Sequence, residues 1–331
     1  MRKLCSIVMA LMLIFVVTAC GNGNDVANDN QNDVADEAVV EGEGEENFRI
    51  AFMTNTLNNT FQIAMHDTYS RLAEEHGFEY VVFDPDYDLN TQLNQMGDVA
   101  SQDFDVVFVI PVDSAGIRQG LETFQERGIP AFNVDTAVIE EDRDLVISIV
   151  ATDAYMAGRL LGEQLVEDFP DGAQIAILDF PENESCVFRV KGFMSGIGDN
   201  IDRFEIVAQQ NGRAALDVSL GLAEDIIQAH PGVQAFFAIN DPSALGVVAA
   251  MQAQNRNDIK VYSIDASPDG KEALLEGHFR GLAAQVPIQI AEQSFFKALE
   301  FLRGNDIDEE ILLPSFLVTL EMAEETLTEW Q

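Results

Sequence analysis

Residues 50–61 read IAFMTNTLNNTF, an apolar run that ends in a polar turn and leads into a helical pattern. Over residues 61–76 apolar side chains recur every three to four positions, which predicts an amphipathic helix, and Gly77 suits its C-terminal end. With a strand over residues 48–53, this stretch forms one strand–turn–helix unit. The rest of the chain repeats that unit.

Further strands are predicted where short apolar runs are continuous rather than alternating, at residues 80–83, 105–110, 130–134, 146–149, 174–178, 204–207, 235–239 and 260–264. Helical patterns are found at residues 155–168, 189–198, 216–229, 243–254 and 268–276. Continuous apolar strands are typical of parallel sheets with helices on both faces. Two successive series of such units therefore predict an α/β fold with two doubly wound parallel-sheet lobes.

The first 19 residues have the layout of a secretory signal peptide. Arg2 and Lys3 precede an apolar run over residues 4–17 that is short for a membrane-spanning helix. The run ends in Val-Thr-Ala-Cys at residues 17–20, which resembles a bacterial lipobox and implies cleavage before Cys20 and lipidation of that cysteine. A plain signal peptide with an incidental cysteine is the alternative.

Residues 20–47 are rich in Asn, Asp, Gly and Glu and contain no aromatic residue. Such a composition cannot bury enough apolar surface to form a core, so we expect a disordered acidic linker that tethers the protein to the membrane. Once the signal peptide and Cys20 are set aside, Cys186 is the one remaining cysteine, and no internal disulfide is expected.

The charge balance excludes two classes of partner. The chain has 57 acidic residues against 18 lysines and arginines, a formal net charge of -39. Nucleic-acid binding depends on basic residues that neutralise phosphates, and basic patches attract anionic lipids. We therefore expect no nucleic-acid partner, and membrane attachment only through the lipid anchor.

Polar side chains gather at the predicted carboxyl ends of the strands, where ligands bind in doubly wound sheets. Hydroxyls of a neutral polyol can donate to carboxylates, accept from a guanidinium and do both with amides, while an aromatic face covers the C–H patch of a sugar. No histidine is among these residues. The candidates are Asn55, Asn59, Phe61, Gln62, Asp135, Thr136, Arg189, Asn240, Asp265 and Gln285.

Several segments resemble the ribose-type periplasmic sugar-binding proteins of ABC importers. They are IAFMTNTLNNTF (50–61), IPAFNVDT, RVKGF, HPGVQAFFAINDPSALG, SIDASPDG and LAAQVP, in order over residues 48–319. The resemblance implies sugar contacts from Asn55, Asn59, Phe61 and Asp135 in the first lobe. It also implies contacts from Arg189, Asn240, Asp265 and Gln285 in the second lobe and its hinge edge.

The same resemblance implies two lobes joined by three crossings. We expect the N-terminal lobe over residues 48–151 plus 286–314 and the C-terminal lobe over residues 152–285 plus 315–331. The crossings should fall near residues 151–152, 285–286 and 314–315, and closure of the lobes over a sugar should create the form that docks on a permease. We expect a monomer without cofactor or metal.

Three positions depart from the family pattern. Gln62 stands where a second aromatic is expected, Thr136 where an arginine often follows the aspartate, and Ala214 where another aromatic is expected. The loss of two stacking faces and one guanidinium should open the pocket. The ligand is therefore expected to be a larger sugar, another pentose, a polyol or a furanose rather than ribose bound in the usual way.

Several alternatives remain. Asn59, Asp135 and Asp265 could simply cap turns or helices, Arg189 could form an ordinary ion pair, and Phe61 could pack in the core. At the level of function, the same fold could serve a sensory receptor for a membrane kinase or chemoreceptor. A repressor core would need a helix-turn-helix where residues 1–47 have a signal peptide and linker.

Enzyme chemistry lacks its usual sequence motifs. No HExxH, GxSxG or GxxxxGK[ST] occurs, and Cys186 has no neighbouring histidine. Asp84, Asp86, Asp88 and Asn90 alternate like the start of a calcium loop, but Leu89 replaces the turn glycine and Gln95 the bidentate glutamate. We interpret this segment as a solvated acidic loop.

Overall fold

A computed structural model describes residues 47–330. These residues belong to one compact unit. The predictions for the signal peptide, for lipidation of Cys20 and for the acidic linker lie outside the described residues, apart from Asn47.

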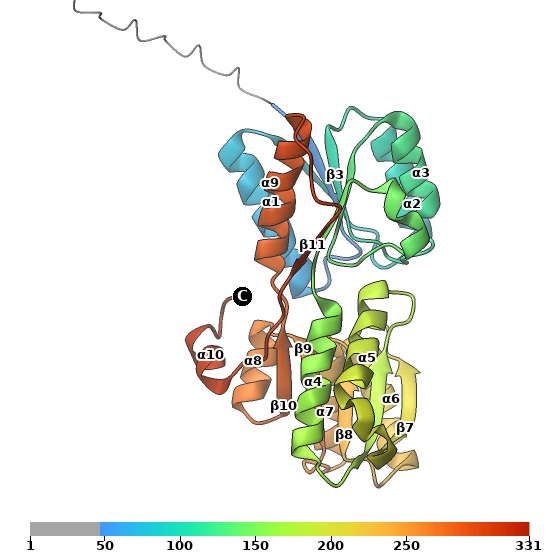
Figure 1. The fold of residues 1–331 in the computed structure, drawn as a ribbon, viewed down its shortest axis with the longest axis vertical. Helices are drawn as coiled ribbons and strands as arrows, with labels where there is room; N and C mark the ends of the chain where they lie inside the picture. Colours follow the sequence, from blue (N-terminus) through green and yellow to red (C-terminus); the bar gives the residue numbers. More distant parts are fainter. Residues whose placement is uncertain (1–46, 331) are drawn as a thin grey trace, which may run out of the picture. The chain divides into compact units, whose positions relative to one another are not determined.

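The N-terminal lobe is built on a parallel sheet of six strands in the order β11-β5-β4-β3-β1-β2. Its strands are β1 (Arg49–Met53), β2 (Glu79–Phe83), β3 (Val106–Val109), β4 (Ala131–Val134), β5 (Ser148–Thr152) and β11 (Glu310–Leu313). In Figure 1, one pair of helices lies on one side of β3 and a second pair lies on the other. The helices of this lobe are α1 (Thr60–His76), α9 (Pro287–Leu302), α2 (Leu89–Ala100) and α3 (Arg118–Arg127), with a 3-10 turn η1 (Glu140–Leu145).

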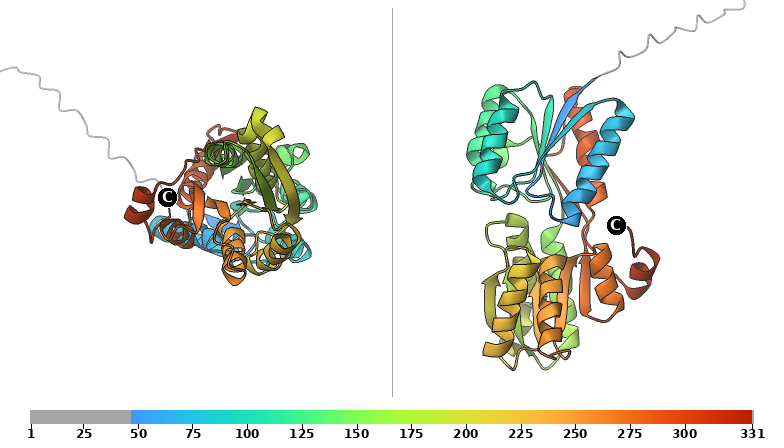
Figure 2. Two further views of the ribbon diagram at one scale, coloured as in Figure 1. Left: turned by 90° about the horizontal axis from the view of Figure 1, so that it is seen from below. Right: turned by 180° about the vertical axis from the view of Figure 1, so that it is seen from behind.

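The C-terminal lobe repeats the architecture on a parallel sheet of five strands in the order β10-β9-β8-β6-β7. The strands are β6 (Ala173–Asp179), β7 (Phe204–Asn211), β8 (Ala235–Ala238), β9 (Lys260–Asp265) and β10 (Phe279–Ala284). The remaining elements are α4 (Ala154–Asp168), α5 (Glu184–Ile197), η2 (Gly198–Arg203), α6 (Leu216–Ala229), α7 (Asp241–Ala253), α8 (Pro268–Leu275) and α10 (Leu320–Glu325). Both sheets and their helices can be followed in Figures 1 and 2. The prediction of two doubly wound parallel-sheet lobes is confirmed.

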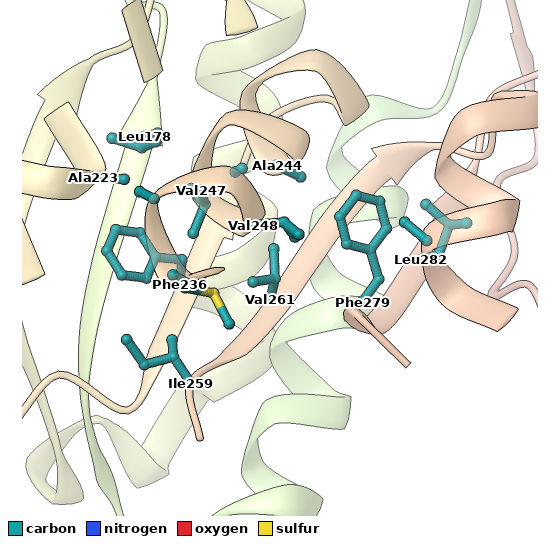
Figure 3. Close-up of a cluster of buried hydrophobic side chains, with 14 of the residues drawn as sticks. Leu178, Ala223, Phe236, Ala244, Val247, Val248, Ile259, Val261, Phe279 and Leu282 are labelled. Atoms are coloured by element: carbon teal, nitrogen blue, oxygen red, sulfur yellow. The ribbon is translucent and has the colours of Figure 1, made fainter. Parts of the chain in front are cut away.

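Continuous apolar strands place one core on each face of a sheet. In β8, Phe236 packs into the cluster under α6 and α7, while its neighbour Phe237 packs into the cluster under α4 and α5. Figure 3 shows Phe236 among Val247, Val248 and Val261. Because successive side chains of a strand point to opposite faces, a run without polar positions must be covered on both.

The chain passes between the sheets after β5, after β10 and after β11. The last crossing pairs with β10, because Ala284 donates its backbone N–H to Phe316 and Val318 donates to Leu282. Ser315 adds a hydrogen bond from its hydroxyl to the carbonyl of Ala284, at 2.8 Å. The carboxyl end of β10 therefore lies beside the last crossing segment.

One local prediction was wrong. The helix predicted from Arg189 begins at Glu184, because the Asn183 side chain accepts from the backbone N–H of Cys186 and caps the first turn. The segment interpreted as an acidic loop is a loop with exposed aspartates over residues 84–88. It ends at Asp88, whose carboxylate caps α2 through the N–H of Thr91, so that Asn90 already lies in the helix.

Candidate ligand-binding site

A pocket lies between the two lobes at the carboxyl ends of their strands. Its cavity volume is about 40 Å³. All ten candidate residues from the sequence line it: Asn55, Asn59, Phe61, Gln62, Asp135, Thr136, Arg189, Asn240, Asp265 and Gln285. The fold thus brings together residues that are up to 230 positions apart in the sequence.

The loop after β1 supplies the first group of pocket residues. Asn59 caps α1, because its Oδ1 accepts from the backbone N–H of Phe61 at 2.8 Å. This cap uses the amide oxygen of Asn59 and leaves its amide nitrogen available. Phe61 is both a core residue, 2% exposed, and a pocket residue. Asn59 and Phe61 therefore each have a structural role and also line the pocket.

Asp135 and Thr136 follow β4 at the same edge of the sheet. Thr136 donates its hydroxyl to Asp135 Oδ2 at 3.3 Å, and Asp135 is buried. Burial raises the pKa of Asp135 to about 6, an effect that Arg189 opposes and Asp265 strengthens. Asp135 therefore titrates nearer to neutral pH than an ordinary aspartate does.

In the C-terminal lobe the charged groups form a connected network. Arg189 donates from Nη1 to the carbonyl of Ile239 at 2.7 Å and lies 3.7 Å from Asp265 Oδ1. Gln285 donates to the same Asp265 oxygen at 2.8 Å, and the backbone N–H of Asp241 donates to Asp265 Oδ2 at 3.2 Å. Burial raises the pKa of both Asp241 and Asp265. The network holds Arg189 and Asp265 in fixed positions.

Asn240 has two structural hydrogen bonds. Its Oδ1 caps α7 by accepting from the N–H of Ser243, and its amide nitrogen donates to the carbonyl of Ala214 at 3.1 Å. Ala214 also lines the pocket at the place where the family pattern has an aromatic side chain. The polypeptide around Ala214 is thereby tied to the start of α7.

Close packing of two helices positions Arg189. Glycines on α4 and α5 let the two backbones touch: a Cβ at Gly158 would lie 2.0 Å from the carbonyl oxygen of Arg189. A Cβ at Gly192 would lie equally close to the carbonyl of Tyr155. Because no side chain separates these helices, the position of Arg189 depends directly on that of α4.

Four further residues, which were not predicted from the sequence, also line the pocket: Tyr87, Phe180, Asn183 and Cys186. Burial raises the pKa of Cys186 to about 12, so its thiol is a packing group rather than a nucleophile. Of these four residues, only Asn183 and Cys186 had a signal in the sequence. Asn183 is a helix-capping residue type that follows β6, and a helix that begins there places its first turn at the strand end. Tyr87 and Phe180 carried no such signal.

Hydrogen bonds across the cleft join the two lobes beside the pocket. Asn183 donates to the Thr136 hydroxyl at 3.0 Å, and Ser185 donates to the carbonyl of Asp135 at 3.0 Å. The backbone N–H of Glu184 donates to the hydroxyl of Ser114 at 3.0 Å. The lobes are therefore in contact, and the first turn of α5 forms one edge of the closed pocket.

Unusual backbone conformations gather at this site. Among residues other than glycine in the described part of the chain, eight have a positive φ, and four of them line the pocket: Tyr87, Asp135, Ala214 and Asp265. Such conformations cost about 1–3 kcal/mol each and persist where the surrounding structure requires them. Their concentration is typical of a functional site.

Several buried polar atoms of the pocket have no partner within residues 47–330. They are the acceptors Asn55 Oδ1, Gln62 Oε1 and Asp135 Oδ1 and the donor Arg189 Nε. A buried polar atom without a hydrogen bond costs about 1–3 kcal/mol. A ligand with several hydroxyl groups would satisfy these atoms.

The described residues contain no cluster of histidine, cysteine and acidic side chains suited to a metal ion. The acidic residues after β2 stabilise local turns rather than forming a cation site: Asp84 accepts a hydrogen bond from the N–H of Asp86 at 2.9 Å. No helix between residues 47 and 330 has the length and apolar character needed to cross a membrane.

Comparison with known proteins gives a consistent result. Residues 50–306 match the family described as periplasmic binding protein domain. The ribose import binding protein of Escherichia coli K12 is 26% identical, covering 93% of this chain and 95% of its own. The D-apiose import binding protein of Actinobacillus succinogenes is also 26% identical, covering 80% of this chain and 85% of its own.

Solved structures share the same fold. A galactofuranose binding protein superposes with a TM-score of 0.80 at 22% identity, covering 84% of this chain and 96% of its own. An ABC transporter solute binding protein from Bacillus halodurans C-125, with bound myo-inositol, superposes with a TM-score of 0.78 at 25% identity. That match covers 85% of this chain and 97% of the other.

Proposed function

This chain belongs to the periplasmic binding protein family, and from that premise we propose that it captures a neutral monosaccharide or polyol between its lobes and delivers it to an ABC importer. The family consists of extracytoplasmic solute-binding proteins rather than enzymes. Relatives of this chain are import binding proteins for ribose and apiose. Capture would stabilise a closed arrangement of the two lobes relative to an open one.

The observation that carries the proposal is the set of unpartnered atoms in the pocket. Three are acceptors, on Asn55, Gln62 and Asp135, and one is a donor, on Arg189. A hydroxyl group both donates and accepts, so a polyol can pair with all four. An amino acid would bring an ammonium and a carboxylate, each of which needs a dedicated partner of opposite charge.

The departures from the family pattern bear on which polyol is bound. Thr136 already accepts from Asn183 and donates to Asp135, so its hydroxyl is engaged where an arginine would reach the ligand. Gln62 offers an amide oxygen where the pattern has an aromatic face. The pocket therefore favours a ligand with many hydroxyl donors over ribose bound in the usual way.

The proposal extends to membrane attachment. The Val-Thr-Ala-Cys segment at residues 17–20 supports lipidation at Cys20, and residues 21–47 would tether the two-lobed body beside the permease. Expression of the natural gene and of a Cys20→Ala variant tests this point: the natural chain should fractionate with membranes and the variant should not.

Ligand screening tests the central proposal. The purified full chain is mixed with D-ribose, D-allose, L-arabinose, D-galactose or myo-inositol, and thermal shift is followed by calorimetry. We expect one compound to bind with a dissociation constant of about micromolar or lower. The Asp265→Ala variant should lose that binding, because it removes the acceptor that Arg189 and Gln285 hold in place.

Asp258→Ala is the matched control. Asp258 lies in the same lobe, its side chain is 63% exposed, and it pairs with Arg256 outside the pocket. Its replacement should leave binding unchanged. If every compound fails to shift the unfolding temperature, the pocket serves a different chemistry and the proposal is wrong.

A further inference from the structure

The aromatic ring of Trp330 packs against a wall of the pocket. Trp330 is the only tryptophan in the chain, and its ring lies edge-to-face with Phe61, with centroids 5.6 Å apart and an interplanar angle of 88°. Phe61 lines the pocket from the N-terminal lobe. Trp330 is thus separated from the pocket by one residue, Phe61.

The segment that carries Trp330 is anchored in the other lobe. Lys271 of α8 is fully buried, and its ammonium donates to the carbonyl of Thr326 at 2.7 Å, to the Thr326 hydroxyl at 3.1 Å and to the carbonyl of Glu329 at 2.5 Å. α10 packs on α8, and Ala323 belongs to the core of the C-terminal lobe. These contacts fix the turn over residues 326–330, here called the C-terminal turn.

The C-terminal turn therefore reaches across the cleft. Its anchor lies in the C-terminal lobe, whereas Trp330 packs against the core of the N-terminal lobe. Figures 1 and 2 show the segment after α10 running toward the end of α1 that faces the other lobe. A contact whose two halves belong to different lobes forms only when the lobes approach each other.

We propose that Trp330 is a positioning residue for ligand capture: held by Lys271, it buttresses Phe61 in the pocket wall and couples that wall to lobe closure. The inference rests on the proposed function, since it names a residue that acts on the same site through Phe61. The three hydrogen bonds from Lys271 to Thr326 and Glu329 hold the C-terminal turn from which Trp330 reaches Phe61.

Variants of the full chain test the coupling by calorimetry with myo-inositol, D-allose and D-ribose. Trp330→Ala should weaken the tightest binding about two- to tenfold, the range expected for one aromatic pair. Trp330→Phe should restore most of the affinity, because it keeps an aromatic edge beside Phe61. Leu320→Ala is the control: Leu320 lies on the same segment and is 59% exposed, and its loss should have no effect.

Lys271→Met tests the anchor. It keeps the apolar stem of the side chain and removes the ammonium, so binding should weaken as it does for Trp330→Ala. The double variant should bind no more weakly than either single variant, since both remove the same coupling. Additive losses, or unchanged affinity in Trp330→Ala, would overturn the proposal.

A measurement without ligand keeps the inference separate from the function on which it rests. The fluorescence of the single tryptophan reports its surroundings directly. We expect Phe61→Ala to shift the emission of Trp330 and Lys271→Met to raise its quenching by acrylamide at least twofold. If no sugar binds but these changes are seen, the proposed function fails and the Trp330 contact stands; if neither change is seen, the inference fails whatever the ligand.

Discussion

In the C-terminal lobe the polar side chains of the pocket hydrogen bond to one another, whereas in the N-terminal lobe three of them each keep an acceptor without a partner. Asp265 receives three donors or near-donors, from Arg189, Gln285 and the N–H of Asp241. By contrast, Asp135 has one weak hydrogen bond, from Thr136, and an unpartnered Oδ1. Within the described residues, the C-terminal half of the site keeps one unpartnered atom, Arg189 Nε, against three acceptors in the N-terminal half.

This difference indicates that the two lobes contribute to ligand binding in different ways. The C-terminal half is preorganised, so a ligand that meets it loses little additional conformational freedom. The N-terminal half has polar atoms that only a ligand, or water, can satisfy, so it contributes when the lobes close. Substitutions in the C-terminal half should therefore affect stability and binding together, and those in the N-terminal half should affect mainly binding.

The largest effect is expected from Arg189→Met. Arg189 is the cation between Asp135 and Asp265, and removing one partner of a buried charge pair costs about 3–5 kcal/mol of unfolding free energy. Protonation of the two aspartates reduces this cost, so about 3 kcal/mol is expected, with sugar binding abolished. Chemical denaturation measures the first effect and calorimetry the second.

Arg159→Met is the control for that experiment. Arg159 lies in the same lobe, its side chain is 40% exposed, and it pairs with Glu163 one helical turn away. Exposed pairs of this kind contribute about 0–1 kcal/mol. If Arg189→Met were no more destabilising than Arg159→Met, the C-terminal half of the pocket could not be called preorganised.

Gly158→Ala should have an intermediate effect that acts through the scaffold. The new methyl group would meet the carbonyl oxygen of Arg189 at 2.0 Å, so α4 and α5 must separate. Overpacking of this kind costs about 1–3 kcal/mol, and sugar binding should weaken because Arg189 moves with α5. Gly221→Ala in α6 is the control, since a methyl group there meets nothing within 4 Å, and it should be neutral or slightly stabilising. Equal effects of both variants would show that the α4–α5 contact does not position the pocket.

The sequence predicted the pocket residues that follow strands better than those that come from loops. Asn55, Asp135, Asp265 and Gln285 could be predicted because each follows an apolar strand, and parallel strands bring their carboxyl ends together. Residues at strand ends can be predicted without knowing how the two lobes contact each other. This is why every sequence-predicted site residue lies in one pocket.

Other features depend on contacts that local patterns do not record. Tyr87 reaches the pocket from a loop with a positive φ, and Trp330 reaches Phe61 in the pocket wall from a segment that follows the last crossing. Neither has periodic spacing or a strand in front of it. Arg189 was identified correctly as a pocket residue but was expected at a helix start, because the cap at Asn183 lies six residues earlier and its role shows only in the folded turn.

The most direct comparison of the two halves is the pH dependence of Asp135. Its pKa rises from 3.8 to about 6 in the folded protein, so the folded state favours the protonated carboxyl. The stability from this group is fully present below pH 3.8 and is lost as the pH rises toward 6, a trend that the raised pKa values of Asp241 and Asp265 reinforce.

Ligand affinity should change in the opposite direction. A sugar hydroxyl that donates to Asp135 Oδ1 favours the carboxylate, so binding releases a proton and affinity rises with pH through 6, by about tenfold for each unit by which the ligand lowers the pKa. Calorimetry between pH 5 and 7.5 measures this rise, and Asp135→Asn should remove it while leaving the folded state as stable or more so. Affinity that rises toward low pH would mean that Asp135 donates to the sugar as a neutral acid, and that the N-terminal half presents a donor rather than an open acceptor.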